Sequence, residues 1–459
     1  MKEANSLEVV ILAAGQGTRM RSQLPKVLHR LGGKPLLGHV IDAARALGPA
    51  AIRIVFGHGG EQVCAALPSA DLHWVRQEAQ LGTGHAVQMA QPHCADAGQV
   101  LVLYGDVPLL QADTLRAFMQ SVPEHGMGLM TVRLADPTGY GRVIRDAAGA
   151  VMRIVEEKDA SPEEKSVGEV NTGIMLLPGK RLGSWLERLG NDNAQGEYYL
   201  TDVVSLARED GVEVQAFAVA DPAEVAGVNN KVQLAELERA FQARQARALM
   251  LAGVLVTDPA RLDIRGEIEI APDTLLEPNV MLEGRVRIGA NCVIGMGCVL
   301  RDVELGDGVE VLPYSVMEGA RIADRVRIGP FARIRPGTTL AEGVHIGNYV
   351  EVKASAIGRG SKVNHLSYIG DAEIGNGVNV GAGAITCNYD GANKHKTIIE
   401  DDVFIGSDTQ LVAPVRVAQG ATIGAGSTIT HDAPAGELTL SRPPQRTRTG
   451  WKRPTKKSG

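Results

Sequence analysis

The second half of the chain repeats aliphatic residues at a step of six. The repeat runs through Ile264, Ile270, Leu276, Leu282, Ile288, Ile294 and Leu300, then Ile322, Ile328, Ile334, Leu340, Ile346 and Val352, then Ile405, Leu411, Val417, Ile423 and Ile429. A hexapeptide repeat predicts a parallel β-helix, in which stacked aliphatic side chains fill a thin core and glycines make the corners. Breaks in the repeat at 301–316 and 386–398 predict register changes or protruding loops, and such loops often carry function.

The composition fits this prediction. The chain has 459 residues, enough for two or three domains, with 54 glycines and only 4% aromatic residues. No apolar run reaches the roughly 18 residues of a membrane-spanning helix, and the apolar run near the start is too short for a secretory signal. The five cysteines are scattered and form no CxxC pair, which predicts a cytoplasmic protein without structural zinc: Cys64, Cys94, Cys292, Cys298 and Cys387.

The charge is unevenly distributed along the chain. The formal net charge is −6, yet residues 442–459 carry only basic charges, on seven Arg and Lys residues. A basic tail on an acidic body can bind nucleic acid or lipid. A mobile, solubilising terminus explains the same pattern more simply, and we favour it.

The first 230 residues follow a different pattern, in which short β-branched runs alternate with amphipathic segments. Strands are expected at 9–13, 52–56, 100–104 and 151–155, and helices at 35–47, 113–122 and 201–210. Alternating strands and helices predict an α/β domain with a mostly parallel, Rossmann-like sheet covered on both faces. Ligands of such sheets bind at the carboxyl ends of the strands.

One long helix is expected to connect the two halves. Residues 230–251 contain no Gly or Pro, and apolar residues recur at helical spacing, at Leu234, Leu237, Phe241, Ala248 and Leu251. We therefore expect a domain at 1–229, a linker helix at 230–251 and a β-helix domain with a basic tail at 252–459.

The loop after the first strand has the residues of a phosphate-binding turn. Gly15 and Gly17 permit a tight turn whose N–H groups can face phosphate oxygens, and Arg19 and Lys26 supply cations. Met20 stands where a dinucleotide-binding fold needs its third glycine, so the loop is not that fingerprint. The two glycines alone would more often form an ordinary turn, and it is the two cations that favour phosphate binding.

Asp106 follows the strand at 100–104, in the sequence Tyr104-Gly105-Asp106. An acid at the carboxyl end of a buried parallel strand is well placed to hold Mg²⁺ between phosphates. The alternative is a helix N-cap after Pro108.

Several motifs together resemble a known enzyme family. LAAGQGTRM (12–20), Pro25-Lys26, QLGTGHA (80–86), YGDVPL (104–109), EYYLTD (197–202) and GVNN (227–230) resemble a sugar-nucleotide pyrophosphorylase. Joined to the hexapeptide half, the chain resembles the bacterial bifunctional N-acetylglucosamine-1-phosphate uridyltransferase/glucosamine-1-phosphate acetyltransferase family from about residue 7 to 453.

The resemblance implies Mg²⁺-dependent uridylyl transfer from UTP to N-acetylglucosamine 1-phosphate. The products would be pyrophosphate and UDP-N-acetylglucosamine, a precursor of peptidoglycan and lipopolysaccharide. It assigns the nucleotide and its phosphates to Leu12, Ala13, Ala14, Gly15, Arg19, Lys26, Gln77, Gly82, Thr83, Tyr104, Gly105 and Asp106. It assigns the sugar to Gly141, Glu156 and Asn171, and Mg²⁺ to Asp106 and Asn229. Without the family pattern, Asn229 would be interpreted as a cap of the connecting helix.

The candidates for a second reaction lie at 333–389, with His365 two residues past the repeat position Val363. A lone His in a strand is more often structural, but acetyl transfer from a thioester to an amine needs a base near neutral pH. The resemblance makes His365 that base. It assigns the amino-sugar phosphate to Arg335, Lys353, Tyr368 and Asn379, and acetyl-CoA to Ala382, Asn388, Tyr389, Ser407, Ala425 and Arg442.

The left hand of the β-helix and a homotrimer formed through it are likewise implied only by the resemblance. We expect small-molecule substrates and no nucleic-acid partner. Two alternatives stay open at this point. One is a single-activity pyrophosphorylase with a non-catalytic, oligomerising β-helix, and the other is a non-catalytic solenoid binding protein.

Overall fold

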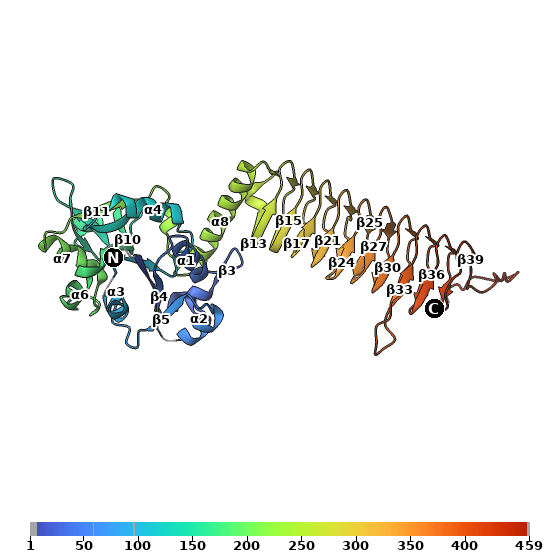
Figure 1. Cartoon of the computed structure of the whole chain (residues 1–459), viewed down its shortest axis with the longest axis horizontal. Helices are drawn as coiled ribbons and strands as arrows, with labels where there is room; N and C mark the ends of the chain where they lie inside the picture. The colour runs from blue at the N-terminus through green and yellow to red at the C-terminus, as the bar shows by residue number, and fades with distance from the viewer. Residues whose placement is uncertain (1–6, 58, 95–96, 457–459) are drawn as a thin grey trace, which may run out of the picture. The chain divides into compact units, whose positions relative to one another are not determined.

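A computed structural model describes residues 7–57, 59–94 and 97–456, and its described contacts divide the chain into two compact units (Figure 1). The first unit ends at Phe241 and the second begins at Gln242. Within the described residues, no helix is both long and apolar enough to cross a membrane.

The first unit contains a nine-stranded, mostly parallel sheet. Its path runs β11-β7-β10-β6-β1-β4-β5, and the parallel centre consists of β1 (Leu7–Ala13), β4 (Ala51–Phe56), β5 (Leu72–Arg76) and β6 (Gln99–Tyr104). The remaining strands of the path are β7 (Met127–Arg133), β10 (Glu169–Pro178) and β11 (Val214–Ala218), of which β10 is antiparallel to both β6 and β7. Three of the four expected strands lie in this centre. The fourth is β9 (Val151–Val155), which pairs only with β8 (Arg142–Arg145) beside the main path.

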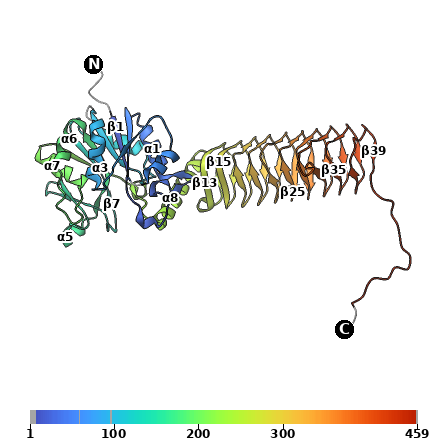
Figure 2. The same cartoon turned by 90° about the horizontal axis from the view of Figure 1, so that it is seen from below.

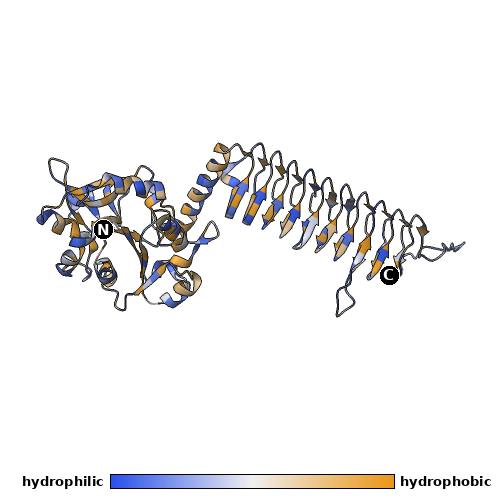
Figure 3. Cartoon of the chain, in the orientation of Figure 1, coloured by the Kyte–Doolittle hydropathy of each residue, from blue (hydrophilic) through white to orange (hydrophobic). Residues whose placement is uncertain are grey.

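Helices cover both faces of this sheet. Alternate residues of β1 face opposite sides, so Val9 and Ile11 join one apolar cluster and Val10 and Leu12 the other. The first cluster includes α1 (Leu36–Arg45) and α4 (Ala112–Ser121), and the second includes α3 (Thr83–Ala90), α6 (Gly179–Glu187) and α7 (Val203–Glu209). The helix expected at 201–210 begins as a 3₁₀ turn, Leu200–Asp202, and continues as α7. The hydropathy colouring shows largely hydrophobic strands in this unit and helices that carry both hydrophobic and hydrophilic residues (Figure 3).

The expected connecting helix is α8 (Lys231–Leu251). Leu237 packs in the first unit against a cluster with Met20, Leu31 and Leu36. In the second unit, the buried Gln242 side chain donates to the Ile264 carbonyl and accepts from the Ile264 N–H, both at 2.8 Å.

The apolar spacing predicts the extent of this helix correctly but does not identify its buried residues after Phe241. Ala248 and Leu251 are exposed, and the residues that face the β-helix core are Gln242, Ala246 and Leu249. A polar residue lies on the buried face because its amide pairs with strand backbone, which an apolar periodicity cannot reveal.

The second unit is a parallel β-helix, left-handed as the resemblance implies, built from an 11-stranded and a 17-stranded sheet. Successive coils pair in register from β13 (Leu262–Ile270) and β15 (Val280–Ile288) onward. Every aliphatic residue of the repeat is buried except Ile270, which is partly buried against the same core. Figure 2 shows the strands stacked side by side and the tail leaving the solenoid after β39 (Leu438–Thr439).

Glycines in this unit either turn the corners of the coils or allow neighbouring coils to approach closely. Gly308 turns a corner at φ +65°. Gly358 instead follows the buried core residue Ile357 at an ordinary φ, and a Cβ there would lie 2.5 Å from the Gly375 carbonyl of the next coil. Glycines after the aliphatic positions are needed because adjacent coils approach closely.

Both breaks in the repeat correspond to irregularities of the solenoid. Leu300 pairs with Leu282 on one side and with Met317 on the other, so the later coil is one residue shorter. The second break is a protruding loop between β32 (Ile385–Cys387) and β33 (Thr397–Ile399), visible in Figure 1.

Candidate active sites

A cavity in the first unit opens at the carboxyl ends of β1 and β6. Eleven of the residues expected to bind the nucleotide line it, together with the expected Mg²⁺ ligand Asn229, namely Leu12, Ala13, Ala14, Gly15, Arg19, Lys26, Gln77, Gly82, Thr83, Tyr104 and Asp106. The sheet brings them together because β4 and β6 both pair with β1 in parallel, so the loops that follow these strands meet at one edge.

The cations of the first loop converge on the two expected metal ligands. Lys26 Nζ lies 2.5 Å from Asp106 Oδ2 and 3.4 Å from Asn229 Oδ1, and Arg19 Nη2 donates to the same Asn229 oxygen at 2.9 Å. Gly17 makes this approach possible, because at φ +61° a Cβ there would lie 2.7 Å from Lys26 Cβ. The loop therefore places two positive charges where a phosphate chain would meet the strand ends.

Asp106 and Asn229 are held together by backbone as well as side chains. The Val228 N–H donates to the Asp106 carbonyl at 2.9 Å. The carboxylate of Glu224, 4% exposed, accepts from the Gln111 N–H at 3.0 Å and so links the segment before Asn229 to the segment after Asp106.

The donor set suits a hard divalent cation. A carboxylate and an amide oxygen face one ammonium group, so the position already favours positive charge, and oxygen ligands are those that Mg²⁺ prefers. No group of three or more His, Cys, Asp or Glu able to hold a metal exists among the described residues. A cation here would therefore complete its coordination with water and substrate phosphate, as Mg²⁺ commonly does.

The opposite side of the cavity is built by the segment 80–84. Gly84 N donates to the Tyr198 carbonyl, Tyr198 N donates to the Leu81 carbonyl, both at 2.8 Å, and the Leu200 N–H donates to Thr83 Oγ1. Gly82 is at φ +107°, and a Cβ there would lie 2.6 Å from the Tyr198 carbonyl. Burial raises the pKa of Tyr104 well above its usual range, so its phenol stays neutral.

The expected sugar residues form a group of their own. Asn171 N donates to the Gly141 carbonyl at 2.8 Å, and a Cβ on Gly141 would contact the Glu156 carboxylate. Glu156 accepts from Thr201 Oγ1 at 3.1 Å, and burial raises its pKa. These three residues and Gly105 are not among the described residues that line the cavity, whereas their neighbours Tyr140 and Thr172 are.

In the second unit, His365 and three expected acetyl-CoA residues share one corner of the solenoid. His365 ends β28 (Lys362–His365) and is exposed. The corner is held by bonds from Leu366 N to Asn348 O, Gly383 N to His365 O, Asp408 N to Ala382 O and Gly426 N to Ser407 O. These bonds connect equivalent positions of successive coils, which are occupied in order by Asn348, His365, Ala382, Ser407 and Ala425, the last being the residue before Gly426. Arg442 Nη1 donates to the Ala425 carbonyl at 2.6 Å.

The expected amino-sugar residues lie mainly on the strands that follow this corner. Tyr368 begins β29 (Tyr368–Gly370) and pairs with Glu351 of β26 (Glu351–Lys353), whose carboxylate accepts from Arg335 Nη1 at 2.8 Å. Lys353 Nζ lies 3.6 Å from Asp371 Oδ2. Asn379 lies on the neighbouring sheet, where β31 (Asn379–Val380) pairs with β28. His365 and Tyr368 belong to one coil, three residues apart in the chain.

The protruding loop supplies Asn388 and Tyr389. The Asn388 amide donates to Asp371, the carboxylate that also faces Lys353. Tyr389 is exposed and forms an antiparallel β-bridge with Lys394. The Lys394 side chain contacts that of Lys353, and this neighbouring positive charge lowers the pKa of Lys394.

Three residues here were not predicted from the sequence. Asn348 Oδ1 lies 3.1 Å from His365 Nδ1, Asp371 links Lys353 to Asn388, and Lys394 contacts Lys353. The only sequence signal for Asn348 and His365 is that they occupy equivalent positions of successive coils, as their register pairing shows.

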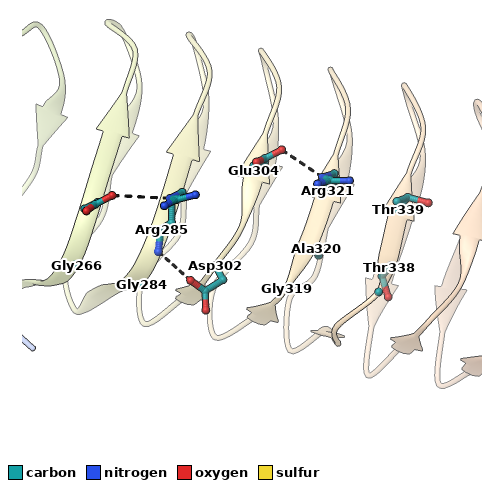
Figure 4. A pocket seen from close by; sticks show the side chains of 12 residues that line it. Gly266, Gly284, Arg285, Asp302, Glu304, Gly319, Ala320, Arg321, Thr338 and Thr339 are labelled. Carbon is teal, nitrogen blue, oxygen red and sulfur yellow. Dashed lines mark hydrogen bonds and ion pairs between the residues drawn. The ribbon is translucent and has the colours of Figure 1, made fainter. Parts of the chain in front are cut away.

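A separate groove crosses the first coils of the solenoid (Figure 4) and includes none of the predicted site residues among its described lining. Its arginines are paired with acids, since Arg285 Nε lies 3.8 Å from Glu267 and Arg321 Nε 3.4 Å from Glu304, and the Asp302 carboxylate accepts from the backbone N–H of Arg285. These ladders connect neighbouring coils and explain the groove as part of the scaffold.

Comparisons with known proteins cover both units. Residues 9–192 match the model of the MobA-like NTP transferase domain, and residues 267–302, 319–354 and 396–431 match the bacterial transferase hexapeptide model. The bifunctional protein GlmU of Chromobacterium violaceum is 57% identical over 455 residues, covering 99% of this chain and 100% of that protein. The chain belongs to the bifunctional GlmU family.

Membership of the GlmU family extends over the whole chain, which is therefore both an N-acetylglucosamine-1-phosphate uridylyltransferase and a glucosamine-1-phosphate acetyltransferase. The alternatives of a single-activity pyrophosphorylase and of a non-catalytic solenoid are set aside. A crystal structure of a putative glucose-1-phosphate thymidylyltransferase from Bacillus anthracis in complex with sucrose is 19% identical and covers 51% of this chain and 94% of that one. Its TM-score of 0.42 is too low to bear on the fold.

Proposed function

We propose that the first-unit cavity performs uridylyl transfer with the residues named above and Mg²⁺, and that His365 is the base for acetyl transfer on the solenoid. The proposal assigns uridylyl transfer to residues 1–229, the linker to 230–251 and acetyl transfer to 252–459. The convergence of Lys26, Arg19, Asp106 and Asn229 at one strand edge carries the first assignment.

In uridylyl transfer, an oxygen of N-acetylglucosamine 1-phosphate attacks the α-phosphorus of UTP, the bond from that phosphorus to its bridging oxygen breaks, and pyrophosphate leaves. The attacking phosphate is already an anion, so no protein nucleophile is required. Arg19 and Lys26 bind and orient the phosphates, and Asp106 and Asn229 would hold Mg²⁺. When bound, Mg²⁺ supplies charge neutralisation on the phosphate oxygens.

In acetyl transfer, the amine of glucosamine 1-phosphate attacks the thioester carbonyl of acetyl-CoA. A C–N bond forms, the C–S bond breaks, and the amine loses a proton as the CoA thiol leaves. The Asn348 oxygen accepts from His365 Nδ1, which keeps the proton on Nδ1 and leaves Nε2 to accept the proton of the amine. Ala382, Ser407 and Ala425 lie along the same corner, and we assign the extended thioester arm of acetyl-CoA to them.

We also propose a cytoplasmic homotrimer formed through the solenoid. The side chains of Tyr314, Phe331 and Tyr349 stack on successive coils at 5.5 and 5.4 Å and are all about half exposed. An exposed apolar row of this kind is typical of an association surface. The five free cysteines support a reducing compartment. Light scattering of the purified chain measures the oligomeric state directly.

The test of the proposed function is to incubate the pure chain with glucosamine 1-phosphate, acetyl-CoA, UTP and Mg²⁺ and to follow free thiol and pyrophosphate separately. Thiol release should need only the first two substrates. Pyrophosphate release should need UTP, Mg²⁺ and either acetyl-CoA or added N-acetylglucosamine 1-phosphate. Pyrophosphate release without an N-acetylated sugar phosphate would contradict the proposed sequence of reactions.

A further inference from the structure

The amide of Gln77 is fixed from behind the nucleotide cavity. Gln77 lines the cavity, yet its side chain belongs to a residue that is only 3% exposed. Its Nε2 lies 3.2 Å from the Gly82 carbonyl oxygen and 2.9 Å from Nδ1 of His85. His85 lies on α3 and is not among the described residues that line the cavity.

These two contacts determine the orientation of the amide. A carbonyl oxygen only accepts, so the NH₂ end of Gln77, not its oxygen, faces Gly82. The same nitrogen faces His85, so Nδ1 must be the acceptor and the imidazole is neutral with its proton on Nε2. Both amide hydrogens are then engaged, and Gln77 meets a ligand through Oε1, which is only an acceptor.

We propose that His85 is a positioning residue that sets base specificity by presenting Oε1 of Gln77 to the base. This inference rests on the proposed function of the cavity as a UTP site. Uracil carries an N–H donor at its ring N3, which complements Oε1. Cytosine carries an acceptor at N3, which would place two acceptors face to face in a buried site, an arrangement that binding sites reject strongly.

His85 is needed because the Gly82 contact alone is the longer of the two. Without the His85 acceptor, the NH₂ end of Gln77 is held only by the longer Gly82 contact. Turning the amide over still costs that hydrogen bond and brings Oε1 against the Gly82 carbonyl, but it no longer costs the bond to His85 as well, so Nε2 can more readily donate to N3 of cytosine. The choice between uracil and cytosine would thus depend on a residue that does not touch the nucleotide.

The test compares His85→Leu, which removes the acceptor, with His85→Asn, whose Oδ1 can replace Nδ1. Both are measured as holoenzyme with Mg²⁺, by kcat/KM for UTP and CTP and by the Kd of each nucleotide. His85→Leu should lower the UTP/CTP ratio by about tenfold or more, and His85→Asn should retain most of it. Gln88→Leu is the matched control, because Gln88 lies on the same helix and donates to the Leu186 carbonyl, and it should leave the ratio unchanged.

The Gln77→Ala background separates an effect through Gln77 from any other. Adding His85→Leu there should change the UTP/CTP ratio less than twofold, which is the coupling expected of two residues that act as one unit. Thermal melts of each variant distinguish a folding defect, which lowers turnover of both nucleotides together.

The outcomes separate the two proposals. A wild-type chain that does not use UTP contradicts the proposed function itself. A wild-type chain that uses UTP while His85→Leu keeps the wild-type ratio, or loses both nucleotides equally, overturns the role of His85. A lowered ratio in His85→Leu together with an equal fall in His85→Asn also overturns it, because the acceptor would not be what matters.

Discussion

The ammonium group of Lys26 lies 2.5 Å from the carboxylate of Asp106, although the two residues are 80 positions apart in the chain. Both side chains are largely shielded from solvent. The ion pair joins the loop after β1 to the loop after β6, which are neighbours because β1 and β6 pair in parallel. The phosphate-binding cation Lys26 and the proposed Mg²⁺ ligand Asp106 are therefore already adjacent before any substrate binds.

Replacing the Asp106 carboxylate should disable uridylyl transfer alone. Asp106→Asn removes the negative charge that favours a divalent cation, so we expect pyrophosphate release to fall by about 100-fold or more and the Mg²⁺ concentration required to rise. Acetyl transfer, measured as thiol release, should be unchanged. Asp113→Asn is the control, because Asp113 is an exposed acid that pairs with Arg116 one helical turn away. Equal loss of both activities would count against the assignment.

The buried Glu224 should matter for stability and for the metal ligands together. Glu224→Leu leaves the Gln111 N–H without its carboxylate acceptor, which should cost about 1–3 kcal/mol in the free energy of unfolding. It also loosens the link between the segments of Asp106 and Asn229, so the Mg²⁺ requirement should rise. Denaturant unfolding and Mg²⁺ titration check the two effects. The exposed Glu124→Leu should show neither, and a Glu224→Leu chain with wild-type Mg²⁺ dependence would refute the link.

Close packing of the coils predicts that Gly358→Ala is destabilising. The added methyl would meet the Gly375 carbonyl at 2.5 Å, and this overpacking should cost about 1–3 kcal/mol. Gly343→Ala is the matched control: its φ is +69° and its Cβ would meet no atom within 4 Å, so it should cost about 1 kcal/mol from backbone strain alone. The free energy of unfolding of each variant is measured by denaturant titration, following the loss of β-structure. If Gly343→Ala proved more destabilising than Gly358→Ala, the positive φ of the corners, and not the close approach of the coils, would be the main reason for glycine in the solenoid.

The buried Glu156 should make the free energy of unfolding depend on pH. Burial raises the pKa of its carboxyl, and the nearby Asp202, Asp159 and Glu197 act in the same direction. The folded state therefore holds the proton more tightly than the unfolded state, and the stability from this group is present at acid pH and lost as the pH rises through the raised pKa. Glu156→Gln, which keeps an acceptor for Thr201, should raise the free energy of unfolding at pH 7 and converge with wild type at acid pH. A variant less stable than wild type at pH 7 would reverse the expected sign.

The repeat of aliphatic residues predicts the solenoid well because one period specifies both the buried position and the coil. Ile346 and Val352 could be placed in the core from spacing alone, and both are buried. Leu251 could not, because helical spacing does not say how far a packing partner extends, and it is exposed. The roles of Glu224 and Asp371 depend on hydrogen bonds between separate segments of the chain, for which the sequence carries no signal, and Asn348 is marked only by its equivalence to the position of His365 in the next coil.

The central claim is that one polypeptide holds two separate catalytic centres, and His365→Ala tests it most directly. The variant is assayed for thiol release with glucosamine 1-phosphate and acetyl-CoA, and for pyrophosphate release with added N-acetylglucosamine 1-phosphate, UTP and Mg²⁺. Loss of the base should lower thiol release by about 10²–10⁴-fold and leave pyrophosphate release within twofold of wild type. Thiol release near the wild-type rate, or a parallel fall in both reactions, would contradict the account.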